Sequence, residues 1–417
     1  MNHLKKLIPQ PVKNLYHLAQ AMLANLVYGF PSKSIRVIGV TGTNGKTTTV
    51  QMITKILEEA GHIVAMASTI NFKIGGKEWK NLSHFTTLSP FAVQKFILEA
   101  VKARCEYVVL ETSSHSLDQY RVWGLDYKTA IITNVTREHL DYHKTMGKYR
   151  EAKFKLFRKA ECVIVNGDME KAGDFLQFDN KNKIIYSLKD NKANIFAANI
   201  QLGINNSEFS IDNSQFKLNL PGDFNIENAL AAVSVGISEN ISLETCAKAL
   251  EKIKNVPGRM EYIKNEKGLN ILVDFALTPD ALEKLYALLE KTKKPGAKII
   301  AVFGSCGERD RGKRPIMGEI VSRFADFVIV TNDEPYHENP AQIIREITAG
   351  IKNKKEGVNL LIIPDRREAI QKALQLGQAD DIVAVTGMGA EESMVIGDQK
   401  IPWDDRKVIR EILPELK

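Results

Sequence analysis

The segment from Val37 to Thr49, with the sequence VIGVTGTNGKTTT, constrains the fold more than any other part of this chain. It is typical of a buried strand, a glycine-rich turn and the start of a helix, whose backbone N–H groups and positive end bind phosphates. Lys46 would contact the outer phosphates and the Thr47 hydroxyl would ligate Mg²⁺. Because Val40 stands where the general P-loop pattern has glycine, the pattern alone leaves open a turn without ligand. The residues expected to hold a nucleoside triphosphate are Gly42, Thr43, Asn44, Gly45, Lys46, Thr47 and Thr48.

Length and composition describe an ordinary globular protein. With about 150 residues per domain as a guide, 417 residues should form two or three domains. A formal charge of +7 without a basic block suits small anionic substrates and does not indicate nucleic-acid binding. The four cysteines lie far apart, which argues against a zinc site or a disulfide framework. We therefore expect the reducing environment of the cytoplasm.

An apolar stretch at residues 15–30 follows Lys5, Lys6 and Lys13 and superficially resembles a membrane anchor. Polar residues interrupt it, whereas a membrane span needs about 20 apolar residues in succession. We expect an amphipathic helix that docks on the body of the protein. The alternative is peripheral contact of residues 1–30 with a membrane surface.

A parallel sheet is predicted around the phosphate-binding turn, because short apolar runs alternate with helical patterns. The run Tyr107–Leu110 is followed by Glu111, and the run Ala130–Thr133 leads into a segment that contains His139. Ligands bind at the carboxyl ends of strands in such sheets, so Glu111 should face the triphosphate, and Asn134 and then His139 should lie at the same edge. Alternating runs between residues 184 and 220 predict β-hairpins.

The turn Val256–Arg259, with the sequence VPGR, is the best candidate for a domain boundary because Pro and Gly end the helical pattern before it. A new alternation of strands and helices follows and predicts a second, doubly wound domain. We expect an N-terminal helical segment at residues 1–34, a central domain at 35–256 and a C-terminal domain at 257–417.

Six stretches carry a family resemblance. In their order along the chain, they are similar to the motifs of the Mur ligases, ATP-dependent enzymes that add amino acids to the peptidoglycan precursor. The MurE type, UDP-N-acetylmuramoyl-tripeptide synthetase, is the most similar. The resemblance covers residues 35–417 and implies an α/β fold: a P-loop central ATPase domain with a parallel sheet plus β-hairpins, followed by a Rossmann-like doubly wound C-terminal domain. The stretches are 41–47 (TGTNGKT), 111–121 (ETSSHSLDQYR), 133–143 (TNVTREHLDYH), 220–225 (LPGDFN), 256–261 (VPGRME) and 308–315 (ERDRGKRP).

The resemblance implies a two-step amide ligation. ATP phosphorylates the C-terminal carboxylate of a muramoyl-peptide acceptor, and the amine of a free amino acid, expected to be a diamino acid, displaces phosphate from the acyl phosphate. The implied catalytic residues are Lys46, Glu111, His139 and Lys153. Two Mg²⁺ ions are expected, one at Thr47 and Glu111 and a second near His139. Lys153 matches a lysine that the family carbamylates into an anionic ligand, with an unmodified surface lysine as the alternative.

The resemblance also implies contacts with the nucleotide and the substrates. His115 and His143 are expected to be packing or supporting groups rather than catalysts. Asn225 would contact adenine, while Arg259 and Asp274 would close over the nucleotide. Arg309 would bind the carboxylate of the incoming amino acid through its guanidinium. The remaining substrate positions are Thr86, Thr87, Ser113, Gln119 and Arg121 for the acceptor, the selectivity motif Asp333, Glu334, Pro335 and Tyr336, and the neighbouring Gly387 and Glu391.

The chain departs from the family pattern away from the phosphates. Leu277 replaces a histidine and Met388 a common lysine. Tyr336 replaces the arginine typical of diaminopimelate-adding enzymes, which puts meso-diaminopimelate in doubt. Only 34 residues precede the first strand, too few for the usual uridine-nucleotide-binding domain. The expectation is therefore an acceptor held without nucleotide contacts, or a different acceptor.

Three other carboxylate acceptors remain open for a monomeric ligase of this kind: folylpolyglutamate, cyanophycin and lipid-linked precursors. A non-enzymatic alternative is a catalytically silent nucleotide-binding subunit. The presence of Lys46, Glu111, His139 and Lys153 argues against that alternative.

Overall fold

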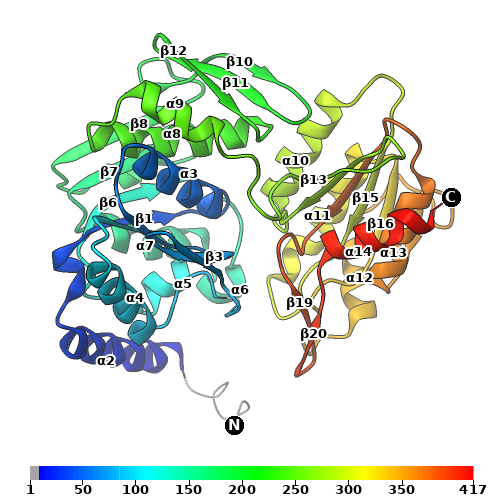
Figure 1. Cartoon of the computed structure of the whole chain (residues 1–417). Helices are drawn as coiled ribbons and strands as arrows, with labels where there is room; N and C mark the ends of the chain where they lie inside the picture. The colour runs from blue at the N-terminus through cyan, green and yellow to red at the C-terminus, as the bar shows by residue number, and fades with distance from the viewer. Residues whose placement is uncertain (1–8, 84, 417) are drawn as a thin grey trace.

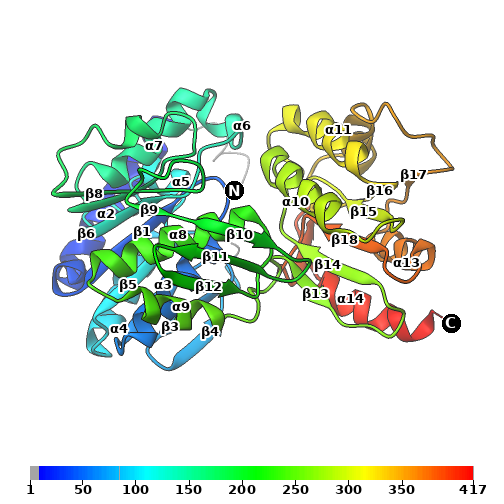
Figure 2. The ribbon, with the colours of Figure 1, turned by 90° about the horizontal axis from the view of Figure 1, so that it is seen from above.

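The computed structural model describes residues 9–83 and 85–416, which form two lobes side by side (Figures 1 and 2). The central lobe contains the residues before the Val256–Arg259 turn, and the C-terminal lobe contains those after it. Each lobe is built around its own mostly parallel sheet. This arrangement confirms the predicted α/β fold with two successive sheet domains.

The main sheet of the central lobe orders its strands β4-β3-β2-β5-β1-β6-β7-β8-β9. All pairings from β2 to β9 are parallel, and β3 and β4 add an antiparallel edge. A separate antiparallel sheet contains β10, β11 and β12. The bounds are β1 Arg36–Thr41, β2 Val64–Ala67, β3 Asn71–Ile74, β4 Lys77–Lys80, β5 Tyr107–Glu111, β6 Tyr127–Ile132, β7 Cys162–Asn166, β8 Asn182–Ser187, β9 Ile195–Phe196, β10 Ala198–Leu202, β11 Ser207–Ile211 and β12 Ser214–Leu218.

Helices cover both faces of this sheet. One apolar core lies under α3, α8 and α9, and a second lies under α4 and α7. Since both faces are buried, the inner strands are continuous apolar runs rather than alternating ones. The helices are α2 Gln10–Tyr28, α3 Lys46–Glu59, α4 Pro90–Lys102, α5 Ser114–Asp118, α6 Leu140–His143, α7 Met146–Phe157, α8 Asp223–Ser238 and α9 Leu243–Glu251, with 3₁₀ turns η1 Pro31–Ser34 and η2 Ala172–Phe175.

The order of the strands places the phosphate-binding turn at a crevice. Strand β1 lies between β5 and β6, so the chain leaves β1 where the two halves of the sheet diverge. Val40 of β1 pairs with Glu111 of β5, and Thr133 follows β6 at the same edge. The turn after β1 and the residues that end its two neighbours therefore converge, as the sequence predicts.

The predicted set of hairpins between residues 184 and 220 is only partly present. Strands β10, β11 and β12 are antiparallel, but β8 pairs in parallel with β7 and extends the main sheet, together with β9. A short apolar run between polar breaks does not show whether a neighbouring strand is parallel or antiparallel to it. Alternation alone therefore could not distinguish the two arrangements.

The C-terminal lobe has the predicted doubly wound form. Its sheet orders the strands β13-β14-β18-β15-β16-β17, and β13 is antiparallel to β14. Helices α10, α11 and α12 pack on one face, while α13 and α14 pack on the other. The elements are β13 Glu261–Ile263, β14 Asn270–Asp274, α10 Pro279–Thr292, β15 Ile299–Phe303, η3 Arg311–Lys313, α11 Arg314–Phe324, β16 Phe327–Val330, α12 Pro340–Thr348, β17 Leu360–Ile362, α13 Arg366–Leu376, β18 Ile382–Thr386, β19 Ser393–Ile396, β20 Gln399–Pro402, α14 Asp405–Ile412 and η4 Leu413–Glu415.

The predicted N-terminal helix is present as α2, which lies beside α4 on the central lobe (Figure 1). It begins after Pro9 and ends at Gly29, whose φ of 70° gives the left-handed turn that glycine favours at a helix end. Within the described residues, no helix is both long and apolar enough to cross a membrane.

Candidate active site

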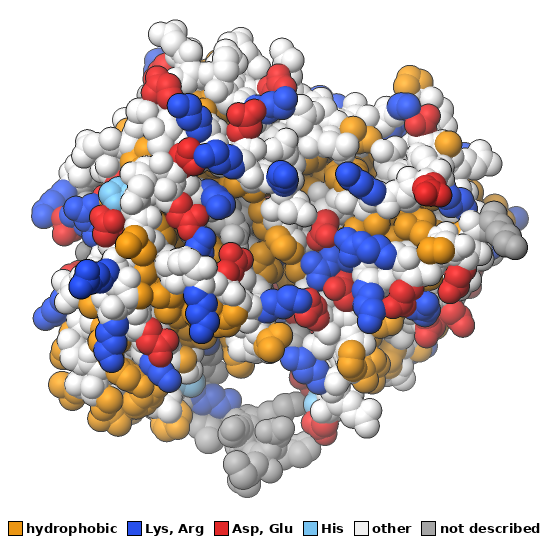
Figure 3. Space-filling view, in the orientation of Figure 1, with side chains coloured by type: hydrophobic (Ala, Val, Ile, Leu, Met, Phe, Trp, Pro, Cys, Tyr) orange, Lys and Arg blue, Asp and Glu red, His pale blue; other side chains and the backbone are white. Residues whose placement is uncertain are grey.

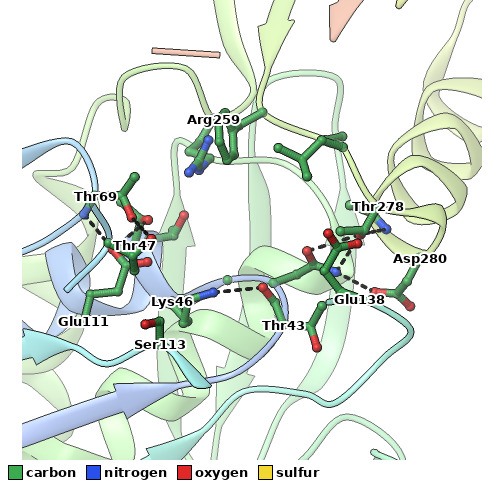
Figure 4. A pocket seen from close by; sticks show the side chains of 18 of the residues that line it. Thr43, Lys46, Thr47, Thr69, Glu111, Ser113, Glu138, Arg259, Thr278 and Asp280 are labelled. Atoms are coloured by element: carbon green, nitrogen blue, oxygen red, sulfur yellow. Dashed lines mark hydrogen bonds between the residues drawn. The ribbon is translucent and has the colours of Figure 1, made fainter. Parts of the chain in front are cut away.

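A cavity of about 510 Å³ lies between the lobes and is lined by both of them (Figure 4). The central lobe contributes the phosphate-binding turn and the residues at the carboxyl ends of β5 and β6. The C-terminal lobe contributes segments after β14, β15 and β16. The sequence-predicted residues on its wall are Thr43, Asn44, Gly45, Lys46, Thr47, Thr48, Thr86, Glu111, Ser113, Gln119, Arg121, His139, Asn225, Arg259, Asp274, Arg309, Glu334, Tyr336 and Glu391.

Two glycines of the turn are required by close packing. A Cβ atom on Gly45, whose φ is 83°, would lie 2.2 Å from Oδ1 of Asn228. A Cβ atom on Gly42 would lie 1.8 Å from Oγ1 of Thr133. Any side chain at either position would displace the turn from α8 or from the segment after β6. Glycine therefore keeps the backbone of the turn in its place against these neighbours.

Lys46 is the first residue of α3 and directly follows the glycine-rich turn. Its ammonium donates hydrogen bonds to the carbonyl oxygens of Gly42 and Thr43, at 3.2 and 2.9 Å. Burial lowers the pKa of Lys46, and the nearby Glu111 carboxylate acts in the opposite direction. A phosphate chain in the turn would add further negative charge and favour the ammonium form.

Glu111 and Thr47 form the oxygen-rich side of the turn (Figure 4). The Thr47 hydroxyl donates to Oε2 of Glu111 at 3.0 Å, and the backbone N–H of Thr69 donates to the same oxygen at 2.8 Å. A hydroxyl and a carboxylate are hard oxygen ligands that suit Mg²⁺. These two side chains therefore fit one metal ion beside the phosphates. No group of three or more His, Cys, Asp or Glu side chains arranged for a metal occurs among the residues that the structure describes.

His139 lies at the start of α6 in a left-handed conformation, with φ of 58°. Its ring centroid lies 4.6 Å from that of His115, which in turn lies 5.4 Å from that of His143. Burial, reinforced by neighbouring positive groups, lowers the pKa of His139 well below its usual value and lowers that of His115 to about 3. These imidazoles are therefore neutral at physiological pH, the form in which histidine can ligate a metal.

Lys153 does not lie on the cavity wall. It is fully buried on α7 beneath the turn, where its amine donates to the carbonyl of Gly42 at 2.9 Å and lies 4.4 Å from the ring centroid of Tyr149. The alternative of a surface lysine is therefore wrong. Burial, together with the charge of Lys46, lowers the pKa of Lys153 well below its usual value. The neutral amine is favoured at this position.

Thr87 supports the acceptor side of the cavity from behind its wall. Its hydroxyl donates to the carbonyl of Glu111 at 3.0 Å and accepts from the N–H of Ser113 at 3.0 Å. Its carbonyl accepts from the guanidinium of Arg121, also at 3.0 Å. Thr87 thus holds together three residues predicted to contact substrates or metal. We find Thr86 on the wall itself, so the predicted pair divides into a lining residue and a supporting one.

Arg259 and Asp274 approach the turn from the C-terminal lobe. Arg259 lies 4.3 Å from the ring centroid of Phe275. The Asp274 carboxylate accepts from the N–H groups of Met260 and Ala276, both at 2.7 Å. Burial raises the pKa of Asp274, while the Arg259 charge acts in the opposite direction. Asp274 therefore fixes the backbone around Arg259.

The C-terminal lobe contributes the predicted amino-acid contacts to the cavity wall. The Arg309 guanidinium lies 5.6 Å from the ring centroid of Tyr336, and the Tyr336 hydroxyl donates to Oε2 of Glu334 at 3.2 Å. Asp333, Pro335 and Gly387 do not line the cavity. Gly387 packs behind it, since a Cβ atom there would lie 2.5 Å from Oδ2 of Asp333.

Several lining residues were missed by the sequence reasoning. Two of them are Thr278 and Asp280 in the other lobe. Their side chains accept hydrogen bonds from the side chain of Asn44 in the turn, at 3.2 and 3.0 Å. Asn228 follows the predicted Asn225 by one helical turn, a spacing that puts both on one face. The other missed residues have no such local signal, because contact between two lobes does not depend on a local sequence pattern. The other missed wall residues are Thr69, Phe85, Glu138, Phe224, Glu227, Met260, Phe275, Ala276, Leu277, Ala281, Lys284, Leu285, Cys306 and Lys313. Asn134, predicted at this edge of the sheet, and His115, expected to be a packing or supporting group, also line the cavity.

Comparison with known proteins gives the same family on both lobes. The pattern of the Mur ligase middle domain matches residues 40–236, and that of the Mur ligase glutamate ligase domain matches residues 258–389. A UDP-N-acetylmuramoyl-L-alanyl-D-glutamate–2,6-diaminopimelate ligase of Clostridium acetobutylicum is 39% identical over 406 residues, covering 95% of this chain and 82% of that protein. A UDP-N-acetylmuramyl-tripeptide synthetase of Roseiflexus is 38% identical, covering 96% and 82%.

Solved structures agree with these matches. A UDP-N-acetylmuramoyl-L-alanyl-D-glutamate–2,6-diaminopimelate ligase superimposes with a TM-score of 0.63 at 32% identity, covering 91% of this chain and 78% of that one. Folylpolyglutamate synthase of Mycobacterium tuberculosis has a higher TM-score of 0.73 and coverages of 89% and 92%, but only 15% identity, so it shares the fold alone. The motifs, the two-lobed fold and these relatives together show that the chain belongs to the Mur ligase family of ATP-dependent ligases.

Proposed function

We propose that this chain is a MurE-type ligase that uses ATP to join a diamino acid to a UDP-muramoyl dipeptide in peptidoglycan precursor synthesis. The observation that carries the proposal is one cavity whose wall combines chemically distinct groups from the two lobes. Lys46, Thr47 and Glu111 provide groups suited to phosphates and Mg²⁺, while Arg309 and Tyr336 line the same cavity from the other lobe. An activated acceptor carboxylate and an incoming amine can therefore meet between them.

The residues that line the cavity have separate roles in an ADP-forming ligation that proceeds through an acyl phosphate. Lys46 holds the transferred phosphate, and Arg309 orients the amino acid through its carboxylate. Bound Mg²⁺ would neutralise the charge that builds up on the phosphates. We propose Thr47 and Glu111 as ligands of one ion. For a second, we propose His139 together with Lys153 as a carbamate, which the buried neutral amine of Lys153 would form with CO₂.

The identity of the amino acid depends on the neighbourhood of Tyr336. Diaminopimelate has a second carboxylate that needs a cationic partner, and the phenol of Tyr336 donates instead to the carboxylate of Glu334. Burial raises the pKa of Tyr336, so this phenol stays neutral and provides no charge. Several relatives are named for diaminopimelate, which makes it the first amino acid to test, with L-lysine beside it.

The remaining parts of the proposal concern organisation. We propose domains at residues 35–256 and 257–417 behind the helical segment at 1–34. We also propose a monomer. A cytoplasmic location suits the four cysteines, which are all free.

A coupled assay of ADP release tests the function directly. The purified chain would receive ATP, Mg²⁺, the UDP-muramoyl-L-alanyl-D-glutamate acceptor and one amino acid at a time, with products identified by mass spectrometry. We expect ADP and a tripeptide product only when acceptor and amino acid are both present. Turnover with a folate and glutamate, but not with the muramoyl acceptor, would overturn the proposal.

A further inference from the structure

Helix α2 exposes an unusual amount of apolar side chain. Seven of the fourteen large hydrophobic residues that are exposed in the described chain lie on this one helix. Every exposed residue within α2 is apolar or is Tyr16, and Figure 3 shows the resulting patch over α2 at the lower left. We call these seven residues the apolar stripe. They are Val12, Leu15, Tyr16, Met22, Leu23, Leu26 and Val27, with exposures of 44% to 68%.

The opposite face of α2 is the polar one, and it is bound to the body of the protein. Asn14 donates to the carbonyl and the carboxylate of Asp118, both at 3.2 Å, and Gln10 donates to the Tyr142 hydroxyl at 3.0 Å. Asn25, fully buried, donates to the carbonyl of Trp123 at 2.9 Å. These bonds fix the rotation of the helix about its axis. The apolar stripe therefore faces away from the body of the protein, while the predicted docking of α2 on the body is present.

The charged residues of the N-terminal segment that contains α2 are all basic. The chain has no Asp or Glu before Glu58, whereas Lys5, Lys6, Lys13 and Lys33 lie within or beside the helical segment in sequence. Lys33 is exposed just beyond the end of α2. An apolar strip on a helix whose own charged residues are basic complements a surface that is apolar inside and anionic at its boundary.

A second copy of the chain fits this strip less well than a lipid surface does. One face of a 19-residue helix measures roughly 28 Å by 10 Å, about a third of the area of about 800 Å² that each partner buries in a standard protein interface. Two copies would also bring lysines toward lysines with no acidic residue of α2 between them. Anionic headgroups would instead pair with those lysines.

We propose that the apolar stripe of α2 is a docking surface for the anionic face of a lipid bilayer. The helix lies parallel to the membrane and inserts its stripe to the depth of the headgroups and upper acyl chains. Its polar face remains bonded to the central lobe, so the ligase docks as a body. This inference does not depend on the identity of the acceptor or the amino acid.

Vesicle flotation tests the proposal with the full chain. One set of vesicles contains phosphatidylcholine alone, and the other contains one third phosphatidylglycerol. We expect the wild type to float with the anionic vesicles and far less with the neutral ones. The triple variant Leu15→Ser/Leu23→Ser/Leu26→Ser should lose at least tenfold in partitioning, while Lys13→Gln/Lys33→Gln should lose binding chiefly at low salt, where charge attraction is least screened.

A matched control removes exposed apolar side chains elsewhere. Ile237→Ser/Val358→Ser, at positions 37% and 58% exposed, should float like the wild type. Neither set of variants touches the cavity, so ADP release with soluble substrates should be unchanged in both. A Tyr16→Trp variant should show blue-shifted fluorescence that is quenched by lipids brominated near the headgroup.

The contrary outcomes are equally specific. A wild type that never floats with anionic vesicles, or a triple variant that floats as well as the wild type, overturns the proposal. Light scattering that shows concentration-dependent dimers of the wild type, lost in the triple variant and without vesicle binding, would assign the stripe to a second copy instead.

Discussion

The carboxylate of Glu138 in the central lobe accepts two hydrogen bonds from the ammonium of Lys313 in the C-terminal lobe, at 3.0 and 3.3 Å. Both side chains are almost fully buried, at 5% and 2% exposure. Lys313 also donates to the carbonyl of Leu277 at 2.9 Å. Since Glu138 immediately precedes His139, this pair links the contact between the lobes to the backbone that carries a proposed metal ligand.

Removing one partner of this pair should be costly. Lys313→Met would leave the Glu138 carboxylate buried without its cation, which typically costs about 3–5 kcal/mol. Burial already raises the pKa of Glu138 while Lys313 acts to lower it, so the variant should raise that pKa further. We expect a lower free energy of unfolding in urea and a reduced kcat, with stability partly restored in Lys313→Met/Glu138→Leu.

The neighbouring pair of Arg137 and Asp310 provides the control. It also joins the lobes, but its atoms are 3.4 Å apart and the Arg137 side chain is 45% exposed. Arg137→Ala should therefore change stability by less than about 1 kcal/mol. Equal effects of Arg137→Ala and Lys313→Met would show that burial does not distinguish the two pairs.

Lys46→Ala should abolish ATP turnover while leaving the fold intact. The substitution removes a cation whose hydrogen bonds go to two carbonyl oxygens of the turn, so little packing is lost. Loss of one charged donor at a phosphoryl-transfer site typically lowers kcat by about a hundredfold or more. Lys55→Ala on the same helix removes an exposed ion pair with Glu58 and should leave ADP release unchanged. A Lys46→Ala enzyme with wild-type turnover and melting curve would contradict the phosphate role.

Local patterns predicted most of the architecture because each element has a strong signal of its own. The apolar runs of β15 and β18 and the Ser-Pro start of α4 are visible in the sequence and present in the structure. The direction of β8 was mispredicted because strand alternation does not encode the neighbour. The docking of α2 on the body was predicted, but its partners Asp118 and Tyr142, which are more than 100 residues away, were not.

In the candidate site too, local motifs were predicted correctly, whereas contacts between distant parts of the sequence were not. Residues in contiguous motifs, such as Thr47 and Glu111, meet as expected. The Glu138–Lys313 pair was missed because it joins positions 175 apart, although both lie within matched motifs. Lys153 was predicted as a site residue, but its place beneath the turn, rather than on the cavity wall, depends on packing against Tyr149.

Lys153→Ala should lose most activity and regain part of it with added acetate or formate. The proposed carbamate is an anion, and a small carboxylate can occupy the space that the truncation opens. Lys148→Ala, at an exposed position on the same helix, should keep wild-type activity, and added acetate or formate should not alter that activity. The measurement is ADP release with and without formate, with chloride at equal ionic strength as the salt control. Removing bicarbonate should also slow the wild type. Full activity of Lys153→Ala without any additive would contradict a role for this residue.

Tyr336→Arg should shift the choice of amino acid toward meso-diaminopimelate. The second carboxylate of diaminopimelate would gain a cationic partner where the wild type offers a neutral phenol, and an unpaired buried carboxylate costs several kcal/mol. The ratio of kcat/KM for meso-diaminopimelate to that for L-lysine should therefore rise at least tenfold, which corresponds to about 1.4 kcal/mol. Glu334 remains beside the new guanidinium and Arg309 as a counter-charge.

Tyr336→Phe is the matched control for that shift. Tyr336 has a left-handed backbone, with φ of 50°, so Arg and Phe would bear the same strain at this position. Phe removes the hydroxyl that donates to Glu334 without adding a charge. If the amino-acid ratio changes equally in both variants, loss of the phenol explains the effect. If it changes in neither, position 336 does not determine which amino acid is added.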